Sequence, residues 1–361
     1  MESVGIDVHP WSVRGADQTR KTAQQISSEL GELIANVAPA ILHFNSLSTS
    51  RIGGPIAREL AIPSLGYIRD IMKLSKKAIS DLNQIDRIIA VSNATRQWHV
   101  DQGLDPARTF TVYNGVDNEL FGPLTTDQPR PSDDHDIHSE LSIPPQAPVL
   151  IFVGQLGMRK GVDILIESFF QVAAQTEAHL LIIGQRHSQK IEAIQYHQKL
   201  VAAVDSSAYR QRVHWLGRRT DVADIMARAT MLIHPARQEP LGRVLLESAA
   251  SGLPIVTTNV GGSAEILCDD AGANDANLSR LLVELPALPE NEVPNPDNRN
   301  VLNQQLSVRM SERILELLRA TNELTQIGKQ LRLRAIDNFS IERCASQIDS
   351  HYKSLTSRAI E

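Results

Sequence analysis

The stretch MLIHPARQEPLGRVLLESAASGLPIVT, residues 231–257, carries the pattern that decides the fold. Residues 231–234 form a short apolar run, residues 242–250 have the apolar spacing of a helix, and residues 254–257 form a second apolar run. Short apolar runs bounded by turn residues are typical of buried strands, and a strand–helix–strand order favours parallel neighbours. We therefore predict a β–α–β unit here.

The same alternation extends on both sides of this stretch. After residue 148 we predict strands at 149–153, 180–183 and 212–216, and helices at 162–174 and 222–228. Before residue 125 we predict strands at 40–44, 64–68, 87–91 and 110–113, and helical segments at 57–60 and 76–82. Repeated units of this kind predict the α/β class, with two Rossmann-like domains that each contain a doubly wound parallel sheet.

The domain boundaries follow from length and composition. A chain of 361 residues exceeds what one hydrophobic core usually organises. Residues 122–148 contain six prolines and no periodic apolar face, which is typical of a linker. We predict a first domain at 1–125, a linker at 126–147, a second domain at 148–337 and a C-terminal helix at 338–361.

Composition and charge exclude several classes of protein. The chain is 42% hydrophobic with a net charge of −6, so no global basic field indicates nucleic-acid binding. The two cysteines, Cys268 and Cys344, are too few for a disulfide framework and fit a reducing compartment. No apolar run reaches the roughly 18 residues that span a bilayer, and residues 1–15 lack a signal-peptide pattern. We expect a cytoplasmic protein.

The predicted ligand site begins directly after the strand at 231–234. A residue before proline is pushed out of helical geometry, so we expect Glu239 on a loop and aimed away from the strand end. The next helix should begin at Pro240 or Leu241, where no side chain caps it and free N–H groups attract an anion. Glu247 follows eight residues after Glu239, up to ~12 Å further along a helix. This spacing suits a ligand with a hydroxyl-bearing group at each end and a phosphate between, although two glutamates on a helix also form an ordinary solvated face.

Two further glycine-rich segments favour the ligand site over that alternative. Gly261 and Gly262 follow a predicted strand and precede a short helix that contains Glu265. The segment GQLGMRKG, residues 154–161, follows the strand at 149–153; from it we select Gly154, Gln155, Arg159 and Lys160 as site residues. Open α/β sheets bind ligands outside the carboxyl ends of their strands, so three such loops predict a diphosphate site.

These residues resemble the retaining glycosyltransferases of family 4, which have the GT-B fold. Glu239 and Glu247, with seven residues between them, match the family's pair of glutamates. The resemblance implies that the first contacts the transferred sugar and that the second holds the ribose hydroxyls. Lys160 matches the family's phosphate-binding lysine. The resemblance also implies backbone contacts to the sugar and diphosphate from Leu241, Gly242, Arg243 and Val244.

Other segments extend the resemblance from about residue 38 to the C-terminus. NGVD at 114–117 and IIAVS at 88–92 match segments at the end of the family's first domain. Phe339, Ser340 and Tyr352 resemble its closing helix, which implies that 338–361 crosses back to the first domain. The GT-B fold implies that the two domains face a cleft.

The sequence departs from the family at three places. Gln155 stands where members usually have an arginine, so one phosphate-binding cation is missing and Arg159 is the candidate replacement. Arg69 stands where many members have a histidine; it cannot act as a base but can bind phosphate or an acidic acceptor. His43 is either another polar group of the cleft or a structural histidine. Few residues precede the strand at 40–44, which predicts a shortened first domain.

The resemblance implies sugar transfer from a nucleotide-diphosphate sugar to a glycan or lipid-linked acceptor, with retention and without a metal or other cofactor. The leaving diphosphate would take the acceptor's proton, so no dedicated base is required. Asp134-His135-Asp136 matches an Asp-x-Asp metal motif, but its place in the linker favours a solvated loop. The basic segment 69–77 indicates either a peripheral contact with the inner face of the membrane or, as its acidic neighbours favour, an exposed helix.

Two other functions stay open. A catalytically weak subunit that binds nucleotide sugars and needs a partner fits Gln155 and the short first domain. A nucleotide-sugar epimerase shares the architecture and would act without an acceptor. A nicotinamide dehydrogenase is disfavoured, because neither domain has GxGxxG after its first strand.

Overall fold

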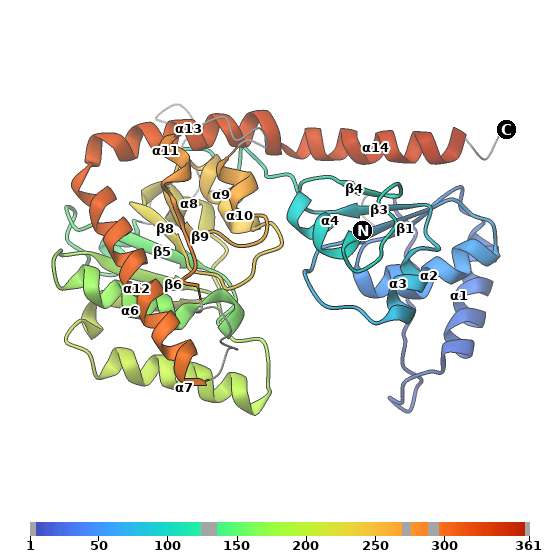
Figure 1. Cartoon of the computed structure of the whole chain (residues 1–361), viewed down its shortest axis with the longest axis horizontal. Helices are drawn as coiled ribbons and strands as arrows, with labels where there is room; N and C mark the ends of the chain where they lie inside the picture. Colours follow the sequence, from blue (N-terminus) through green and yellow to red (C-terminus); the bar gives the residue numbers. More distant parts are fainter. Residues whose placement is uncertain (1–4, 124–135, 269–275, 288–295, 358–361) are drawn as a thin grey trace. The chain divides into compact units, whose positions relative to one another are not determined.

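The computed structural model describes residues 5–123, 136–268, 276–287 and 296–357. The chain forms two compact units. Unit 1 comprises Met1–Ile89, His99–Phe110 and Asp349–Glu361, and unit 2 comprises Ala90–Trp98 and Thr111–Ile348. The chain therefore leaves each unit and returns to it, and the last helix, α14 (Ile341–Ser357), has its final turns in unit 1 (Figure 1).

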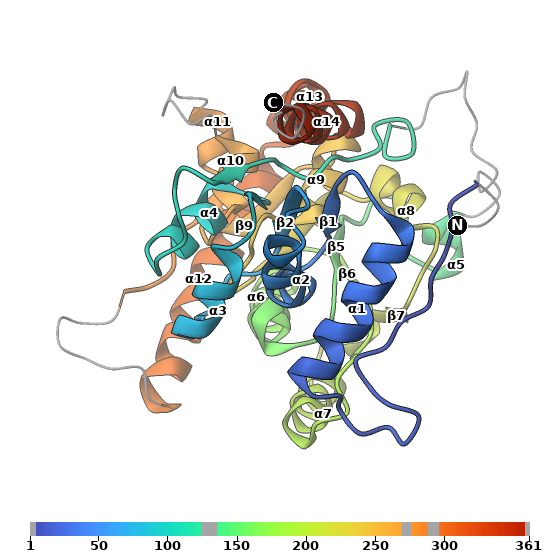
Figure 2. The same ribbon diagram turned by 90° about the vertical axis from the view of Figure 1, so that its right-hand side faces the viewer.

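Unit 1 is built around a four-stranded sheet in the order β1-β2-β3-β4. The strands are β1 (Leu42–Phe44), β2 (Ser64–Ile68), β3 (Arg87–Ala90) and β4 (Thr109–Thr111). β1 and β2 are parallel, with Leu42 opposite Ser64. Helix α2 (Leu47–Glu59) contacts both β1 and β2 as well as α1 (Ala23–Val37) and α3 (Lys76–Leu82) (Figure 2). The predictions of a strand at 64–68 and a helix at 76–82 are confirmed.

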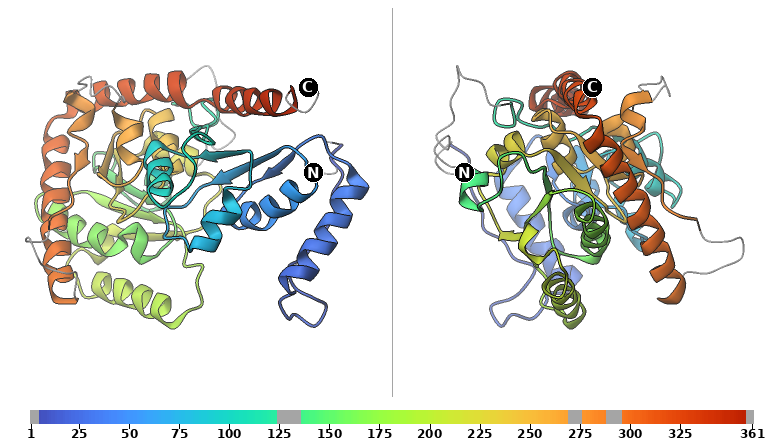
Figure 3. Two further views of the ribbon diagram at one scale, coloured as in Figure 1. Left: turned by 45° about the vertical axis from the view of Figure 1, so that its right-hand side comes forward. Right: turned by 90° about the vertical axis from the view of Figure 1, so that its left-hand side faces the viewer.

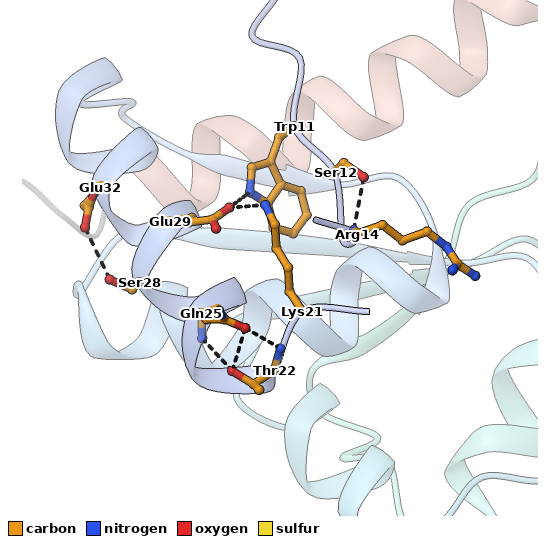
Figure 4. A network of polar contacts seen from close by, with 9 residues as sticks. All are labelled: Trp11, Ser12, Arg14, Lys21, Thr22, Gln25, Ser28, Glu29 and Glu32. Atoms are coloured by element: carbon orange, nitrogen blue, oxygen red, sulfur yellow. Dashed lines mark hydrogen bonds and ion pairs between the residues drawn. The ribbon is translucent and has the colours of Figure 1, made fainter. Parts of the chain in front are cut away.

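Helix α1 (Ala23–Val37) lies where the sequence analysis predicts no element. Its start is a capping box: the Thr22 hydroxyl accepts from the Gln25 N–H, and the Gln25 side chain accepts from the Thr22 N–H (Figure 4). A cap of this kind contributes about 1 kcal/mol. Trp11 and Lys21 both donate to the Glu29 carboxylate, which ties the preceding segment to the helix (Figure 4).

Unit 2 contains a six-stranded sheet in the order β10-β9-β8-β5-β6-β7, and its pairings are parallel. The strands are β5 (Val149–Val153), β6 (His179–Ile183), β7 (Val213–Gly217), β8 (Met231–His234), β9 (Ile255–Thr258) and β10 (Leu282–Val283). Counted from β5, this is the Rossmann order 3-2-1-4-5-6. The order reverses between β5 and β8, so a ligand site is expected where the loops after these two strands meet.

Helices cover both faces of this sheet (Figures 1 and 3). One face carries α6 (Val162–Ala173), α7 (Ile191–Asp205) and α12 (Pro296–Arg319). The other carries α8 (Val222–Arg228), α9 (Arg243–Ala250), α10 (Ser263–Leu267) and α13 (Thr321–Phe339). Packing from both sides leaves β5 and β6 almost wholly buried, which explains their continuous apolar sequences.

Several elements differ from the prediction. Helix α7 was not predicted, because Leu200 and Val204 alone among its described residues are buried, which leaves a weak apolar stripe. The two-residue strand β10 was not predicted either. Residues 126–135 of the predicted linker lie outside the described residues, and its remainder contains a short helix, α5 (Ile137–Glu140).

Candidate active site

The loops after β5 and β8 meet in unit 2, where the strand order reverses. The 3₁₀ turn after β5 (Met158–Lys160) carries Lys160, and the loop after β8 carries Glu239. The Lys160 ammonium lies 2.5 Å from the Glu239 carboxylate, and the two side chains are 14% and 7% exposed. The structure thus joins two predicted site residues that are 79 positions apart in the chain.

Gly161 and Arg237 hold these two loops together. Gly161 has φ +68°, and a Cβ there would lie 1.9 Å from the Pro235 carbonyl oxygen, so only glycine permits this approach. The Arg237 guanidinium binds both carboxylate oxygens of Asp163, at 2.9 and 2.6 Å, and donates to the Met158 carbonyl at 2.7 Å. This bidentate pair fixes the loop of Lys160 against the loop of Glu239.

The Glu239 carboxylate turns back toward strand β8, so the prediction that it points away from the strand end is wrong. His234, the last residue of β8, places Nε2 2.8 Å from Glu239 Oε2. Burial alone would raise the pKa of Glu239, but the hydrogen bonds from His234 and Lys160 and the charge of Lys160 outweigh burial and lower the pKa to about 2. Proline restricts the backbone of the preceding residue and leaves its χ angles free, so the sequence could not show this orientation.

Helix α9 begins at Arg243, later than the predicted start at Pro240 or Leu241. Gly242 has φ +99°, a left-handed conformation that a helix cannot include. Among the described residues no side chain caps α9. The first N–H groups, those of Arg243 and Val244, therefore remain available to an anion.

Glu247 lies one turn into α9, and its side chain is 17% exposed. Burial raises its pKa above the ordinary value, and Arg243, with Nη2 at 3.4 Å, offsets this only in part. The Arg243 side chain is 76% exposed, which makes it a weak partner. Because α9 begins late, the helical path from Gly242 to Glu247 is about 7.5 Å, shorter than predicted for the whole interval.

The other predicted residues of the loop after β5 are more exposed. Gly154 directly follows β5, and the Gln155 side chain is exposed. Arg159 is also exposed, and its Nη1 lies 3.4 Å from the Gln238 carbonyl. Arg159 thus lies beside the Glu239 loop, and its role as the replacement cation stays a prediction.

Gly262 supports the main chain of the Glu239 loop. Its N–H donates to the Glu239 carbonyl at 3.0 Å, and a Cβ there would lie 2.5 Å from the Pro240 carbonyl oxygen. The hydroxyls of Ser92 and Thr95 donate to the same Pro240 carbonyl, at 2.5 and 3.1 Å. These contacts fix the backbone that leads into α9.

Glu265 has partners within the protein. Its carboxylate accepts from the N–H groups of Asn93 and Ala94, at 2.7 and 2.8 Å, and from the Tyr113 hydroxyl at 2.8 Å. These bonds cap the start of α4 (Asn93–Val100), so both oxygens serve a structural role here. Gly261, with φ +53°, forms the turn before α10. A ligand contact of Glu265 stays a prediction.

His43 and Arg69 belong to unit 1. His43 Nδ1 lies 2.5 Å from the Tyr352 hydroxyl, and burial together with the charge of Arg69 lowers the pKa of His43. The Arg69 guanidinium lies 4.6 Å from the centre of the Tyr67 ring and donates to the Asn45 side chain. His43 is the middle residue of β1 and Arg69 directly follows β2, so the two residues form one polar group on neighbouring strands.

His234 and Arg237 were not predicted as site residues. His234 ends a strand five residues before Glu239, and a histidine in that place was an available signal. Arg237 offered no such signal, because its partner Asp163 lies 74 residues away in the chain.

Within the described ranges, no group of three histidine, cysteine, aspartate or glutamate side chains could hold a metal ion. Asp134 and His135 lie outside those ranges, and Asp136 caps α5. No helix that the structure describes is both long and apolar enough to cross a membrane. The predicted exposed helix at 69–77 is present only from Lys76 onward, in α3.

Two family models match different parts of the chain. Residues 4–120 match the model described as Glycosyltransferase Family 4, and residues 147–285 match the model described as Glycosyl transferases group 1. The lipopolysaccharide glucosyltransferase WaaG of Escherichia coli (strain K12) is 31% identical over 276 residues, 76% of this chain and 62% of that protein. The alpha-maltose-1-phosphate synthase of Mycolicibacterium smegmatis is 26% identical over 277 residues, 75% of this chain and 64% of that protein. The matched part of the chain therefore spans just under two thirds of each relative.

Solved structures show the same fold. Anabaena Alr3699/HepE, in complex with UDP, matches with a TM-score of 0.72 and 20% identity, over 91% of this chain and 82% of that one. The sucrose-phosphate synthase of Thermosynechococcus elongatus matches with a TM-score of 0.72 and 18% identity, over 93% of this chain and 78% of that one. The fold is GT-B, with two parallel-sheet α/β domains. Because these two models together match most of the chain, residues 4–120 and 147–285, the chain belongs to glycosyltransferase family 4.

Proposed function

We propose that this protein transfers a sugar from a nucleotide-diphosphate sugar to a hydroxyl of a glycan or lipid-linked acceptor, with retention and without a metal. One observation carries the proposal: Lys160 and Glu239 are in contact at the switch point of unit 2, directly before the uncapped start of α9. A cation, an ionised carboxylate and free N–H groups together suit a sugar diphosphate. Alr3699/HepE was solved with UDP and with UDP-glucose, which supports this class of donor.

Each residue has a distinct role in the proposed reaction. The bond between the sugar's anomeric carbon and the diphosphate oxygen breaks, and a bond from that carbon to the acceptor oxygen forms. The acceptor's proton passes to the departing diphosphate oxygen, so no protein base is needed. Lys160 and the N–H groups of Arg243 and Val244 stabilise the charge on the leaving group, and losing one such contact typically costs ~3–4 kcal/mol of barrier. Glu239 orients the sugar, and Glu247 holds the ribose hydroxyls.

The acceptor side is assigned to unit 1. Arg69 is a permanent cation at the carboxyl end of β2, stacked on Tyr67, and His43 lies on the neighbouring strand. A guanidinium in this place suits a phosphate or carboxylate on the acceptor. We place the reaction in the cytoplasm, in keeping with the free cysteines Cys268 and Cys344.

Thermal unfolding with a panel of nucleotide diphosphates and nucleotide sugars tests the proposal. The variants are Glu247→Ala and, as a matched control on the exposed side of α12, Glu312→Ala. A ligand at a hundredfold its Kd adds about 2.7 kcal/mol of stability. We expect one nucleotide to stabilise the wild type and the control but not Glu247→Ala. No stabilisation by any nucleotide would refute a nucleotide-sugar enzyme.

Product analysis then separates the alternatives. The proposed transferase releases the nucleoside diphosphate only when an acceptor is consumed. A binding subunit, which the exposed Gln155 favours as the second candidate, would bind the donor without turnover. An epimerase would convert the donor without any acceptor.

A further inference from the structure

His234 is a buried titratable residue to which the proposed reaction gives no role. Its side chain has no exposure to solvent, and its ring lies against Phe152 of the neighbouring strand, with centroids 6.4 Å apart and planes 14° apart. Its carbonyl accepts from the Thr257 hydroxyl at 3.0 Å. Strand backbone and packing therefore hold the imidazole in one orientation.

This fixed imidazole contacts only one of the two carboxylate oxygens of Glu239. His234 Nε2 lies 2.8 Å from Oε2, and the Lys160 ammonium lies 2.5 Å from the same oxygen. In the described part of the chain, no side chain or N–H donates to Oε1 of Glu239. The carboxylate is thus held through one oxygen, and the other is left for a ligand.

The contact also settles the protonation of the ring. Glu239 is ionised and has no proton to donate, so the proton in this hydrogen bond must come from Nε2. Burial lowers the pKa of His234, which keeps the ring neutral. Nδ1 is buried and has no hydrogen-bond partner among the described residues, as expected for a ring that carries its proton on Nε2.

We propose that His234 is the positioning residue of Glu239: its Nε2–H holds Oε2 so that Oε1 faces a hydroxyl of the donor sugar. This role rests on the proposed function. When a diphosphate draws Lys160 toward its own charge, His234 is the donor that stays on Oε2. Without His234 the carboxylate would follow Lys160 or turn away from the sugar.

Two substitutions of similar polarity test this role. In His234→Gln the side-chain amide can reach the position of Nε2, whereas in His234→Asn it ends near the position of Nδ1 and cannot reach Glu239. Kd values are measured by calorimetry for the nucleotide sugar that stabilises the wild type and for its nucleoside diphosphate, which lacks the sugar. We expect His234→Asn to weaken the binding of the nucleotide sugar by about tenfold to a hundredfold and to change the binding of the diphosphate little. His234→Gln should keep most of the wild-type ratio.

A ligand-free measurement keeps the two proposals distinguishable. Nitrogen NMR of ¹⁵N-histidine-labelled wild type should show His234 as a neutral ring protonated on Nε2 at pH 7 to 8, because burial lowers its pKa from the ordinary value. A ring protonated on Nδ1, or a charged ring, would overturn the positioning role whether or not a nucleotide binds. Equal losses of affinity for the two ligands in His234→Asn, or no loss of affinity for either, would overturn the positioning role as well. If no nucleotide sugar binds to the wild type, the proposed function fails, and the sugar-positioning role fails with it.

Discussion

Glu239 and Glu247 stand at the two ends of one short interval, but their surroundings differ. Glu239 is held by His234 and Lys160 on one oxygen, and its pKa is lowered to about 2. Glu247 is also largely buried, but its one protein partner among the described residues is the exposed Arg243, and burial raises its pKa. One carboxylate is stabilised before any ligand arrives, and the other is not.

This difference indicates that the two glutamates have different roles in the proposed site. A preorganised carboxylate costs no reorganisation when charge develops at the sugar, which suits the end of the site where bonds change. A poorly solvated carboxylate gains most from hydroxyl groups that a ligand supplies, which suits the end that only binds. The two glutamates should therefore affect stability with opposite signs when each is neutralised.

The largest effect is expected from Glu239→Gln. The change leaves the largely buried Lys160 ammonium without its carboxylate, and the loss of a buried partner typically costs about 3–5 kcal/mol. We expect the melting temperature at pH 7 to fall by roughly 10 °C. Glu312→Gln, on the exposed side of α12, is the control and should leave it unchanged.

The pH dependence of the difference in melting temperature between the wild type and Glu239→Gln tests the cause of that difference. The lowered pKa of Glu239 means that its contribution is present above the ordinary carboxyl pKa and is lost as the pH falls toward 2. The gap between the wild type and Glu239→Gln should therefore narrow below about pH 4.5. A gap of constant size, or none at pH 7, would show that the pair with Lys160 does not stabilise the fold.

Contacts between neighbours in the chain were the predictable part of this site. The β–α–β order and the interval from Glu239 to Glu247 follow from local spacing, and the strands at 149–153 and 231–234 are confirmed. The contact of Lys160 with Glu239 required the strand order, which places β8 beside β5 and not beside β7. A strand order is a property of the whole sheet, and local spacing does not contain it.

Two details of the site were not predictable from the sequence: the residue at which α9 begins and the partners of the Glu265 side chain. The late start of α9 depends on the left-handed backbone of Gly242, and a glycine in a sequence permits that conformation without requiring it. The two N–H partners of Glu265 lie at the start of α4, more than 170 residues earlier in the chain. A glutamate after a glycine pair looks the same whether it binds a ligand or caps another helix.

Glu247→Gln should change the free energy of unfolding in the opposite direction to Glu239→Gln and by a smaller amount. A raised carboxyl pKa means that the folded state loses stability as the pH rises through that pKa, so a neutral amide should relieve the cost at pH 7. We expect a gain of up to about 1 kcal/mol, or roughly 2–4 °C in melting temperature. The stabilisation by nucleotide should be lost in the same variant. A lower melting temperature, or an unchanged response to nucleotide, would contradict the division between the two glutamates.

The smallest expected effect is an increase in affinity for the diphosphate, which we expect to bind between the two glutamates. Gln155 is exposed on the loop that carries Lys160, so Gln155→Arg adds a cation without removing any buried contact. An exposed charge is worth about 0.2–1 kcal/mol, so nucleoside diphosphate affinity should rise about 1.4- to fivefold at low salt. Screening should remove most of this gain at 1 M salt, where the Debye length is about 3 Å. Gln198→Arg, on the exposed side of α7, adds the same net charge elsewhere on unit 2. An equal gain in that control would mean that net charge attracts the nucleotide, whereas no gain in Gln155→Arg would mean that the diphosphate lies out of reach of this loop.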